Sequence, residues 1–359
     1  MSVKVALIGC GNIMNSRHIP ALEALGPRIS IVGVSDPDQA RASITAKRLR
    51  KSANGPVPVH VGNLLIDEAP DWLSVVDLII FGTPPRSHGP LLGRVASLAP
   101  TSVMLMEKPL LVTEDDRHLL TEMPSSDASR ILVMHNFQFA EGFQKVLKLV
   151  NSGAIGQISS IQAYQWSTKD RRLPSWYREL PLGLYWDEGS HFYYLVEALV
   201  GPIRLVMANA FPSHVSGDPT PSVLMTAYQA ENSGIPIAIS MHFEAGISEW
   251  GIIIFGSSGT IIFDMYRDIA FRLPYDGVHL GREVLTTSVV ATISHWRGIA
   301  SSGVRRVRGN LHYGVDVVIG KALDTVAGHQ VDSRLSVQAG LRVTNHMQSV
   351  VDTLTAPNV

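Results

Sequence analysis

The chain has 359 residues, of which 45% are hydrophobic and 17% charged, so it is long enough for two well-buried domains and does not have the composition of a disordered protein. Its 30 Lys and Arg residues nearly balance 31 Asp and Glu residues, which leaves no net basic field to attract nucleic acid. The single cysteine, Cys10, excludes an internal disulfide and a zinc site built from cysteines.

The N-terminal sequence MSVKVALIGCG passes directly into an apolar run and lacks the layout of a signal peptide. We therefore expect a cytoplasmic protein. No uninterrupted apolar run reaches about 18 residues, so no membrane-spanning helix is expected.

The N-terminal part of the chain alternates between short apolar runs and segments with helical spacing. The runs that resemble strands cover 3–9, 29–36, 57–62, 76–84, 102–109 and 130–137. Helical spacing between them is clearest in 19–25 and 115–123. This alternation predicts an α/β fold with a doubly wound parallel sheet, and the nearly continuous apolar character of the runs is typical of strands buried on both faces.

The pattern changes after the last of these runs. A helix is expected over 141–153, ended by Gly153, and a strand over 157–166. Several strand-like runs then follow each other over 204–272 without a good helix between them, which predicts a mostly antiparallel sheet. The stretch 273–312 is expected to be loop with partial helix, its basic run RRVRG to be solvated surface, and the last helix to cover 336–354.

A glycine-rich turn, VALIGCGNIM, follows the first predicted strand. Gly9 would allow the tight turn, and Gly11 would let a pyrophosphate approach the backbone at the positive end of the helix that begins near Asn12. Met14 replaces the third glycine of the dinucleotide fingerprint, and a purely structural turn is the alternative. The cofactor-binding residues predicted in this first βαβ unit are Gly9, Gly11, Asn12, Ile13 and Asp36.

Asp36 ends the second predicted strand of this unit. A carboxylate there can hydrogen-bond the adenosine ribose of NAD and would repel the 2′-phosphate of NADP, although Arg41 is near enough in sequence to keep NADP possible. Cys10 is interpreted as packing within the turn and not as a nucleophile.

Two further segments, FGTPPRSHGP (81–90) and EKP (107–109), follow predicted strands. Ligands of open α/β sheets bind beyond the carboxyl ends of the strands, so both segments are expected to border the cofactor. An ordinary polar strand end is the alternative for Glu107 and Lys108. The cofactor-binding residues predicted here are Thr83, Pro84, His88, Glu107 and Lys108.

The segment YWDEGSHFYY (185–194) places an acid and an imidazole about one helical turn apart, on one face if the segment is helical. Asp187 and His191 could be a helix-surface pair or two ligands of a metal, but no further ligand set at suitable spacing is evident, and we expect no metal site. The neighbouring aromatic residues are most simply core. A basic loop (167–179) that contains Trp176 could grip an anionic substrate such as a nucleotide-linked sugar, or could be solvated.

Taken in order, these motifs resemble the Gfo/Idh/MocA oxidoreductases, a family that includes glucose–fructose oxidoreductase and myo-inositol dehydrogenase. The resemblance covers almost the whole chain, and its specific part is EKP followed much later in the chain by D-x-G-x-H. It rests on GCGNIMNSRHIPAL (9–22), TPPRSH (83–88), EKP (107–109), NFQFAEGFQKVLKLVNSGAIGQISSIQ (136–162) and DEGSH (187–191).

The resemblance implies a dinucleotide-binding domain followed by an α+β domain whose open sheet commonly forms the oligomer contact. It also implies that Lys108 contacts cofactor and substrate and that Asp187 and His191 border the reacting carbon, with His191 the usual candidate for proton transfer. The chain departs from the family at His135 and Gln138, in PLGLYW (181–186), and at Tyr194, where an acid is often found. These departures touch the substrate pocket, so the resemblance does not identify the substrate.

We therefore predict an NAD(P)-binding Rossmann domain over 1–124 and an α+β substrate-binding and oligomerisation domain over 125–359, whose last helix could pack back on the first domain. An imidazole titrates near neutral pH, so His191 can move the hydroxyl proton, with Lys108 assisting and Asp187 orienting. The predicted substrate-binding residues are Lys108, Gln138, Trp176, Asp187 and His191.

The predicted function is an NAD-dependent dehydrogenase or reductase, NADP being possible, that acts on a CH–OH group of a sugar, cyclitol or related polyol. The protein is expected to form a dimer or tetramer through its C-terminal sheet and to bind neither nucleic acid nor membrane. The alternative is a catalytically silent sensor of the same fold that binds a dinucleotide and regulates a partner.

Overall fold

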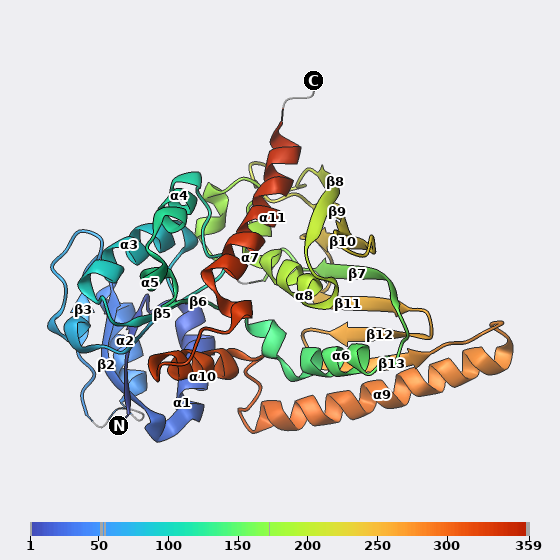
Figure 1. Ribbon diagram of the computed structural model, residues 1–359, viewed down its shortest axis with the longest axis horizontal. Coiled ribbons are helices and arrows are strands. Elements are labelled where there is room, and N and C mark those ends of the chain that lie inside the picture. The colour runs from blue at the N-terminus through green and yellow to red at the C-terminus, as the bar shows by residue number, and fades with distance from the viewer. Residues whose placement is uncertain (1, 51–52, 54, 172, 357–359) are drawn as a thin grey trace. The chain divides into compact units, whose positions relative to one another are not determined.

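The computed structural model describes residues 2–50, 53, 55–171 and 173–356, which form two compact units (Figure 1). The first unit contains the chain up to Asn136 together with Gly314–Thr344, and the second contains Phe137–Tyr313 together with the chain from Asn345. The sequence-based division at 124/125 is a single cut, whereas the chain passes between these units three times.

The first unit is built on a six-stranded sheet in which every pair of neighbouring strands is parallel. This confirms the predicted Rossmann-like sheet. The strand order is β3-β2-β1-β4-β5-β6, so the direction of winding reverses between β1 and β4, which is where ligands bind in such folds. The strands are β1 Val3–Ile8, β2 Ile29–Asp36, β3 Val59–Val61, β4 Leu78–Phe81, β5 Val103–Met106 and β6 Ile131–Val133.

Helices surround this sheet, and the central strands β4 and β5 are buried along their whole length. Helix α10, from the late segment of the chain that returns to this unit, contacts α1, β4 and β5. The helices are α1 Ile19–Leu25, α2 Gln39–Leu49, α3 His88–Leu98, α4 Glu114–Glu122, α5 Ser125–Ala128 and α10 Val315–Val326.

The second unit is built on a seven-stranded sheet in the order β13-β12-β11-β7-β10-β9-β8. Only β7 and β10 pair in parallel, and the other pairs are antiparallel, which confirms a mostly antiparallel sheet. The strands are β7 Ile158–Trp166, β8 Ile203–Phe211, β9 Val223–Ala230, β10 Pro236–His242, β11 Glu249–Gly256, β12 Gly259–Asp264 and β13 Ile269–Pro274.

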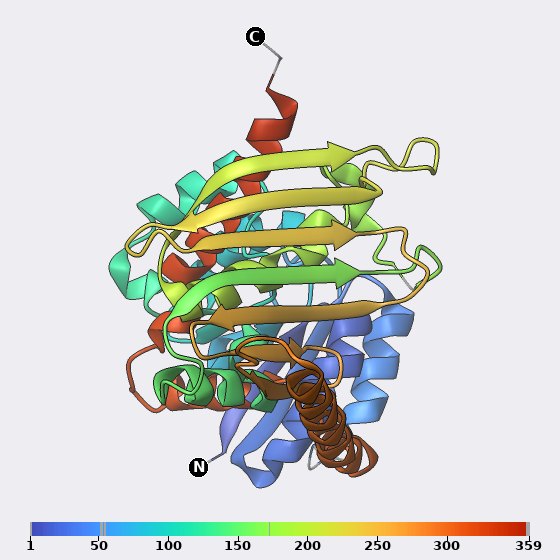
Figure 2. The ribbon, with the colours of Figure 1, turned by 90° about the vertical axis from the view of Figure 1, so that its right-hand side faces the viewer.

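One face of this sheet is covered by helices of the same unit, and the opposite face is open (Figure 2). Buried and exposed residues alternate along β9 and β10, as they do in a sheet with one covered face. The helices are α6 Glu141–Asn151, α7 Tyr185–Glu188, α8 Ser190–Val200 and α9 Gly281–Val307, and α11 Val337–Thr355 begins in the first unit and ends in the second. None of the described helices is long and apolar enough to cross a membrane.

The stretch 273–312 differs from its prediction. It was expected to be loop with partial helix, but it contains the long helix α9, which packs along the edge strand β13. The Ser, Thr and Val residues of this segment have modest helix propensity, so tertiary packing contributes to the choice of helix.

Candidate active site

The glycine-rich turn lies between the end of β1 and the helical segment that precedes α1. Gly9 has a φ of +85°, and a Cβ at this position would lie 2.8 Å from the backbone C and O of Gly82. The fold therefore requires glycine here. A Cβ on Gly11 would meet nothing closer than the Gly82 oxygen at 3.9 Å, so the packing of the chain leaves open space above this residue.

Side chains around the turn hold it in place. The Asn15 amide donates to the backbone oxygens of Cys10 and Gly11, both at 3.0 Å. Met14, at the position of the missing third glycine, is fully buried, and its methyl group lies against Gly82. Cys10 is also buried, and burial raises the pKa of its thiol to about 12, which agrees with its interpretation as packing.

Asp36, at the end of β2, presents a carboxylate to the same turn. Its Oδ2 accepts a hydrogen bond from the backbone N–H of Cys10 at 2.7 Å, and its Oδ1 accepts one from Asp38 at 2.8 Å. Asp38 caps helix α2, and the guanidinium of Arg41 lies 3.4 Å from its carboxylate. Arg41, the cation that could favour NADP, thus lies beside the acidic residue that caps its own helix.

A dinucleotide fits the residues of this unit. Gly11 leaves the space that a diphosphate needs, the turn precedes a helical segment, and Asp36 lies beside the turn. The hydroxyl of Thr83, which follows β4 and packs against Gly9, is buried without a hydrogen-bond partner among the described residues. A ligand hydroxyl or phosphate at this point would satisfy it.

His88, the first residue of α3, connects two of the predicted segments through backbone contacts. Its Nε2 lies 3.0 Å from the carbonyl of Thr83, and its Nδ1 lies 3.0 and 3.1 Å from those of Pro109 and Leu110. Burial lowers the pKa of this histidine, and the carbonyl contacts oppose the shift only in part. The ring therefore fixes the position of the segment after Lys108 relative to the turn at Thr83.

Glu107 and Lys108 follow β5, and Glu107 forms a buried pair with a histidine from the dinucleotide turn. His18 Nε2 lies 2.7 Å from Glu107 Oε1, with the two side chains 1% and 8% exposed. The second oxygen accepts a hydrogen bond from the Lys108 backbone N–H at 3.1 Å. Burial alone would raise the pKa of Glu107, but the hydrogen bond from His18 and the nearby cations hold this pKa below its ordinary value. The half-buried Lys108 thus follows directly after Glu107, whose side chain is held by His18.

In the second unit, His191 lies on α8 and is 6% exposed. Two aromatic rings, those of Phe137 and Trp250, pack around it, and we call them its aromatic collar. The Phe137 ring meets the imidazole edge-on at 4.9 Å between centroids, and Trp250 lies at 5.8 Å. The Tyr194 hydroxyl lies 2.7 Å from Nδ1 of the imidazole. Tyr194, noted above as a departure from the family pattern, thus contacts the imidazole directly.

Asp187, on α7, lies one turn before His191 and is half-buried. The residue between the two short helices, Gly189, has helical φ and ψ angles, so the helical path continues through the D-x-G-x-H motif. A Cβ on Gly189 would lie 2.7 Å from the ring of Tyr185. Glycine therefore lets the Tyr185 ring pack against the motif.

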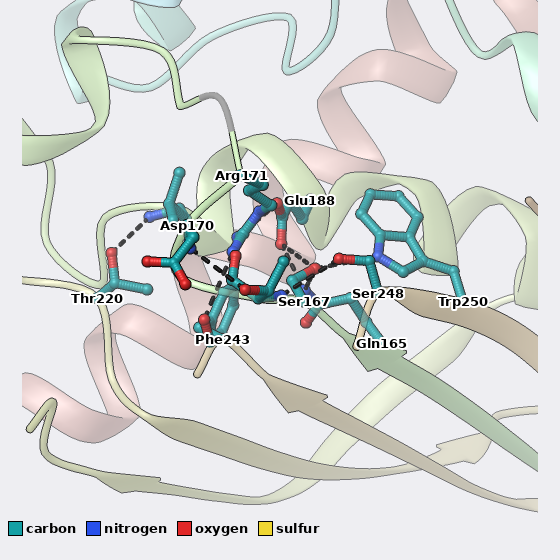
Figure 3. A network of polar contacts seen from close by, with 11 residues as sticks. Gln165, Ser167, Asp170, Arg171, Glu188, Thr220, Phe243, Ser248 and Trp250 are labelled. Carbon is teal, nitrogen blue, oxygen red and sulfur yellow. Dashed lines mark hydrogen bonds and ion pairs between the residues drawn. The ribbon is translucent and has the colours of Figure 1, made fainter. Parts of the chain in front are cut away.

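A network of polar side chains contacts Glu188, a residue within the D-x-G-x-H motif (Figure 3). Glu188, next to Asp187, accepts hydrogen bonds from Arg171 at 2.7 and 3.0 Å and from Gln165 at 2.5 Å. Ser167 receives hydrogen bonds from Gln165 and from the indole of Trp250. The network therefore joins the strand-to-loop segment 165–171 to the motif and to a ring of the collar.

The remaining predicted residues have more varied surroundings. Gln138 is buried, and its backbone oxygen accepts a hydrogen bond from Gln144. Trp176 is half-buried on a short 3-10 helix, Trp176–Glu179. Of the basic loop, Arg171 belongs to the Glu188 network and Arg172 lies outside the described residues. The four aromatic residues flanking the motif are core, as expected: Tyr185, Trp186, Phe192 and Tyr193.

The collar of His191 includes residues that the sequence did not indicate. Phe137 and Trp250 are both far from His191 in the chain, on opposite sides of it, so only the fold brings them together. Tyr194 was noted as a departure, and its place one turn after His191 in the same helix is the signal that predicts its contact. Among the described residues, no cluster of three or more His, Cys, Asp or Glu side chains is placed to hold a metal ion.

Two family models match this chain. One, described as the oxidoreductase family with an NAD-binding Rossmann fold, matches residues 3–135, and the other, the GFO/IDH/MocA C-terminal domain, matches residues 143–262. A relative named inositol 2-dehydrogenase 4, from Saccharopolyspora erythraea, is 30% identical over 158 residues, which are 43% of each chain. The chain spans less than half the length of the curated relatives that it matches.

Solved structures share the fold at low sequence identity. A putative NADPH-dependent oxidoreductase from Desulfitobacterium hafniense has a TM-score of 0.73 at 15% identity, over 98% of this chain and 96% of that one. The WlbA dehydrogenase from Bordetella pertussis, solved with NADH and UDP-GlcNAcA, has a TM-score of 0.71 at 15% identity, over 99% and 96%. With both of its domains matched, the chain belongs to the Gfo/Idh/MocA oxidoreductase family.

Proposed function

We propose that this protein is an NAD-dependent oxidoreductase, with NADP possible, that transfers a hydride between nicotinamide and a carbon of a sugar, cyclitol or related polyol. The observation that carries the proposal is the environment of His191. The burial of the imidazole, its contact with a tyrosine hydroxyl and the aromatic rings around it support a role in proton transfer at a site shielded from water. When bound, the nicotinamide supplies the hydride chemistry.

In this proposal His191 exchanges the proton of the reacting hydroxyl through Nε2, because Nδ1 contacts Tyr194. Lys108 lowers the pKa of that hydroxyl through its positive charge. Asp187, one helical turn before His191, binds a neighbouring substrate hydroxyl or orients the imidazole. The fixed position of Lys108 beside the buried Glu107 carboxylate supports its role.

The cofactor preference rests on Asp36, because a carboxylate beside the turn would repel a 2′-phosphate. The proposed substrate class is supported by the names of two similar proteins. One relative is an inositol dehydrogenase, and one structural neighbour was solved with a nucleotide-linked sugar. We propose that Gln138 and Trp176 help to bind the substrate. We also propose a cytoplasmic dimer or tetramer formed through the open sheet face, where Val206, Met207 and Phe211 of β8 are exposed.

A nicotinamide absorbance assay tests the proposal. The protein is incubated with NAD or NADP and polyols that include myo-inositol, and with NADH or NADPH and keto-sugars, free and nucleotide-linked. We expect turnover with at least one compound and a lower KM for NAD than for NADP. Tight cofactor binding without turnover on any of them would favour the silent sensor.

Variants of the proposed catalytic residues then test their roles. His191→Ala and Lys108→Ala should each lower kcat roughly 10²- to 10⁴-fold. Cofactor binding, measured by NADH fluorescence, should be kept in His191→Ala, whereas Lys108→Ala, which removes a proposed cofactor contact, should also weaken it. Exposed counterparts serve as controls: His279→Ala and Lys47→Ala should leave kcat unchanged. Turnover at the parent rate in a folded His191→Ala protein would remove this residue from the mechanism.

A further inference from the structure

Helix α9 packs on the sheet with only one of its sides. Gly298 lies against Ile269 of β13, where an added Cβ would approach the Ile269 side chain to 3.0 Å. Ser302 is 5% exposed, and the His295 ring meets Phe271 edge-on at 6.2 Å. At about 100° per residue, these positions fall on one narrow arc of the helix.

The other side of α9 carries an exposed apolar stripe. Its members recur with spacings compatible with a single helix face, within an arc of about 100° that lies roughly opposite the buried arc. The stripe residues and their exposed fractions are Leu285 66%, Val289 48%, Ile293 46%, Trp296 67%, Val304 50% and Val307 90%.

Exposure on this scale is unusual for a helix that faces water. Scattered apolar side chains are ordinary on a protein surface, but a continuous stripe that includes a tryptophan marks an interaction surface. From Leu285 to Val307 the stripe is about 33 Å long at about 1.5 Å per residue. The helix also runs out beyond the open face of the sheet, toward the viewer in Figure 2, so its starting half is accessible.

The outer parts of the stripe are nearly symmetric about its tryptophan. Leu285 and Val307 each lie 11 residues from Trp296, and Val289 and Val304 lie 7 and 8 residues from it, so an antiparallel second copy would place these apolar residues opposite one another. In such a twofold pair the two indoles meet at the axis. This arrangement uses one surface twice, as isologous dimer contacts do.

Charges at the two ends of the stripe support the same arrangement. Glu283 and Arg308 lie on the same flank of the helix and at nearly equal separations from Trp296, so an antiparallel pair brings Glu283 of each copy to Arg308 of the other. Neither forms an ion pair with another residue of the described chain. One oxygen of Glu283 is buried without a hydrogen bond in that part of the chain.

We propose that α9 is a dimerisation helix whose partner is α9 of a second copy of this chain, paired antiparallel about Trp296. The helix lies outside both segments that match the family models, and the inference does not depend on the proposed activity. If the open sheet face also pairs, the two separate twofold contacts generate a closed tetramer.

The mass of the full-length protein in solution, measured by light scattering across a concentration series, tests the proposal. Trp296→Asp should halve the mass of the parent assembly, or weaken it about tenfold or more, while the circular dichroism melting curve stays unchanged. Ile44→Asp, an equally exposed apolar site on α2, should leave the mass unchanged. Glu283→Arg and Arg308→Glu should each weaken the assembly, and the double variant should restore it. An unchanged mass in Trp296→Asp would overturn the proposal.

Disulfide trapping tests the antiparallel register. The only cysteine of the parent, Cys10, is buried, so the parent should form no cross-link on mild oxidation. Trp296→Cys should link to its own copy, whereas Leu285→Cys should not, because its counterpart would lie about 33 Å away. Linkage of Leu285→Cys would indicate parallel pairing and contradict the proposal. Binding of a monomeric parent to phosphatidylserine vesicles, lost in Trp296→Asp, would assign the stripe to a membrane surface instead.

Discussion

The two units hold their functional side chains by different means. In the first unit the contacts that fix the site involve the backbone: Gly9 lies against Gly82, and the His88 ring lies between carbonyl oxygens of Thr83, Pro109 and Leu110. In the second unit His191 is held by side chains, through the rings of Phe137 and Trp250 and the hydroxyl of Tyr194.

This difference bears on how each site responds to substitution. Contacts made by the backbone depend on a few glycines and prolines, so the glycine-rich turn relies on few of the side chains around it. A pocket built from rings changes shape with each substitution. The departures at His135, Gln138 and Tyr194 flank the His191 collar in sequence, which is where we expect this chain to differ in substrate from its relatives.

Substitution of the two turn glycines should give the largest effect, and it tests the backbone contacts of the first unit. Gly9→Ala combines a left-handed φ with overlap on Gly82, so we expect a loss of roughly 2–6 kcal/mol in the free energy of unfolding, measured by urea denaturation. Gly11→Ala should leave the free energy of unfolding unchanged, because its Cβ points into open space. It should weaken NADH binding, because that space is where the diphosphate would lie. Equal effects of both changes on stability would show that Gly11 is also a packing residue.

The buried pair of His18 and Glu107 is the exception in the first unit, since it relies on two side chains. His18→Ala would leave a buried carboxylate without its partner and should cost about 3 kcal/mol at pH 7. His18→Gln, which can still donate a hydrogen bond, should recover part of the loss. Urea denaturation of the three proteins measures both differences.

The pH dependence of the same pair has a definite sign. Because the folded pKa of Glu107 is lowered, the pair stabilises the fold above the unfolded pKa of about 4.3, and this contribution disappears as the pH falls through the lowered value. The stability difference between parent and His18→Ala should therefore shrink on acidification. Lys108 and His88, the other basic groups near Glu107, are present in both proteins and affect both alike. A difference that grows toward acid pH would contradict this account.

Sequence patterns predicted the parts of the structure that depend on local periodicity and special backbone angles. The six strands of the first unit, the helix at 141–151 with Gly153 at a φ of +69° after it, and the turn at Gly9 were all expected from such signals. The D-x-G-x-H motif was expected to be helical, and Gly189 keeps helical angles.

Contacts between residues far apart in the chain could not be predicted from such local patterns. The approach of Phe137 and Trp250 to His191 depends on where η5 and β11 lie after folding, η5 being the 3-10 turn Asn136–Phe139. The length of helix α9 was underestimated for another reason. Its apolar residues face solvent and its small residues face β13, so the usual inference that apolar residues mark the buried face fails there.

Substitution of Tyr194 should give the smallest effect, and it tests the side-chain contacts that hold His191 in the second unit. Tyr194→Phe removes the hydroxyl at Nδ1 of His191 and keeps the ring, so kcat should fall about tenfold, equal to about 1.4 kcal/mol in transition-state stabilisation, with little change in stability. Tyr193→Phe is the matched control, because that hydroxyl contacts Tyr185 and Tyr228 instead of the imidazole.

Tyr194→Asp then distinguishes orientation from charge. A carboxylate beside the imidazole stabilises the imidazolium, so for alcohol oxidation, in which the neutral imidazole accepts the proton, the acidic limb of the kcat/KM profile should move to higher pH. Asp187, the carboxylate one turn before His191, is present in both proteins, and Phe137 and Trp250 are neutral, so a shift of the limb reports the new carboxylate. A profile that stays fixed in Tyr194→Asp while Tyr194→Phe loses activity would leave Tyr194 with a purely orienting role, and an unchanged kcat in both would separate His191 from the rate-limiting proton transfer.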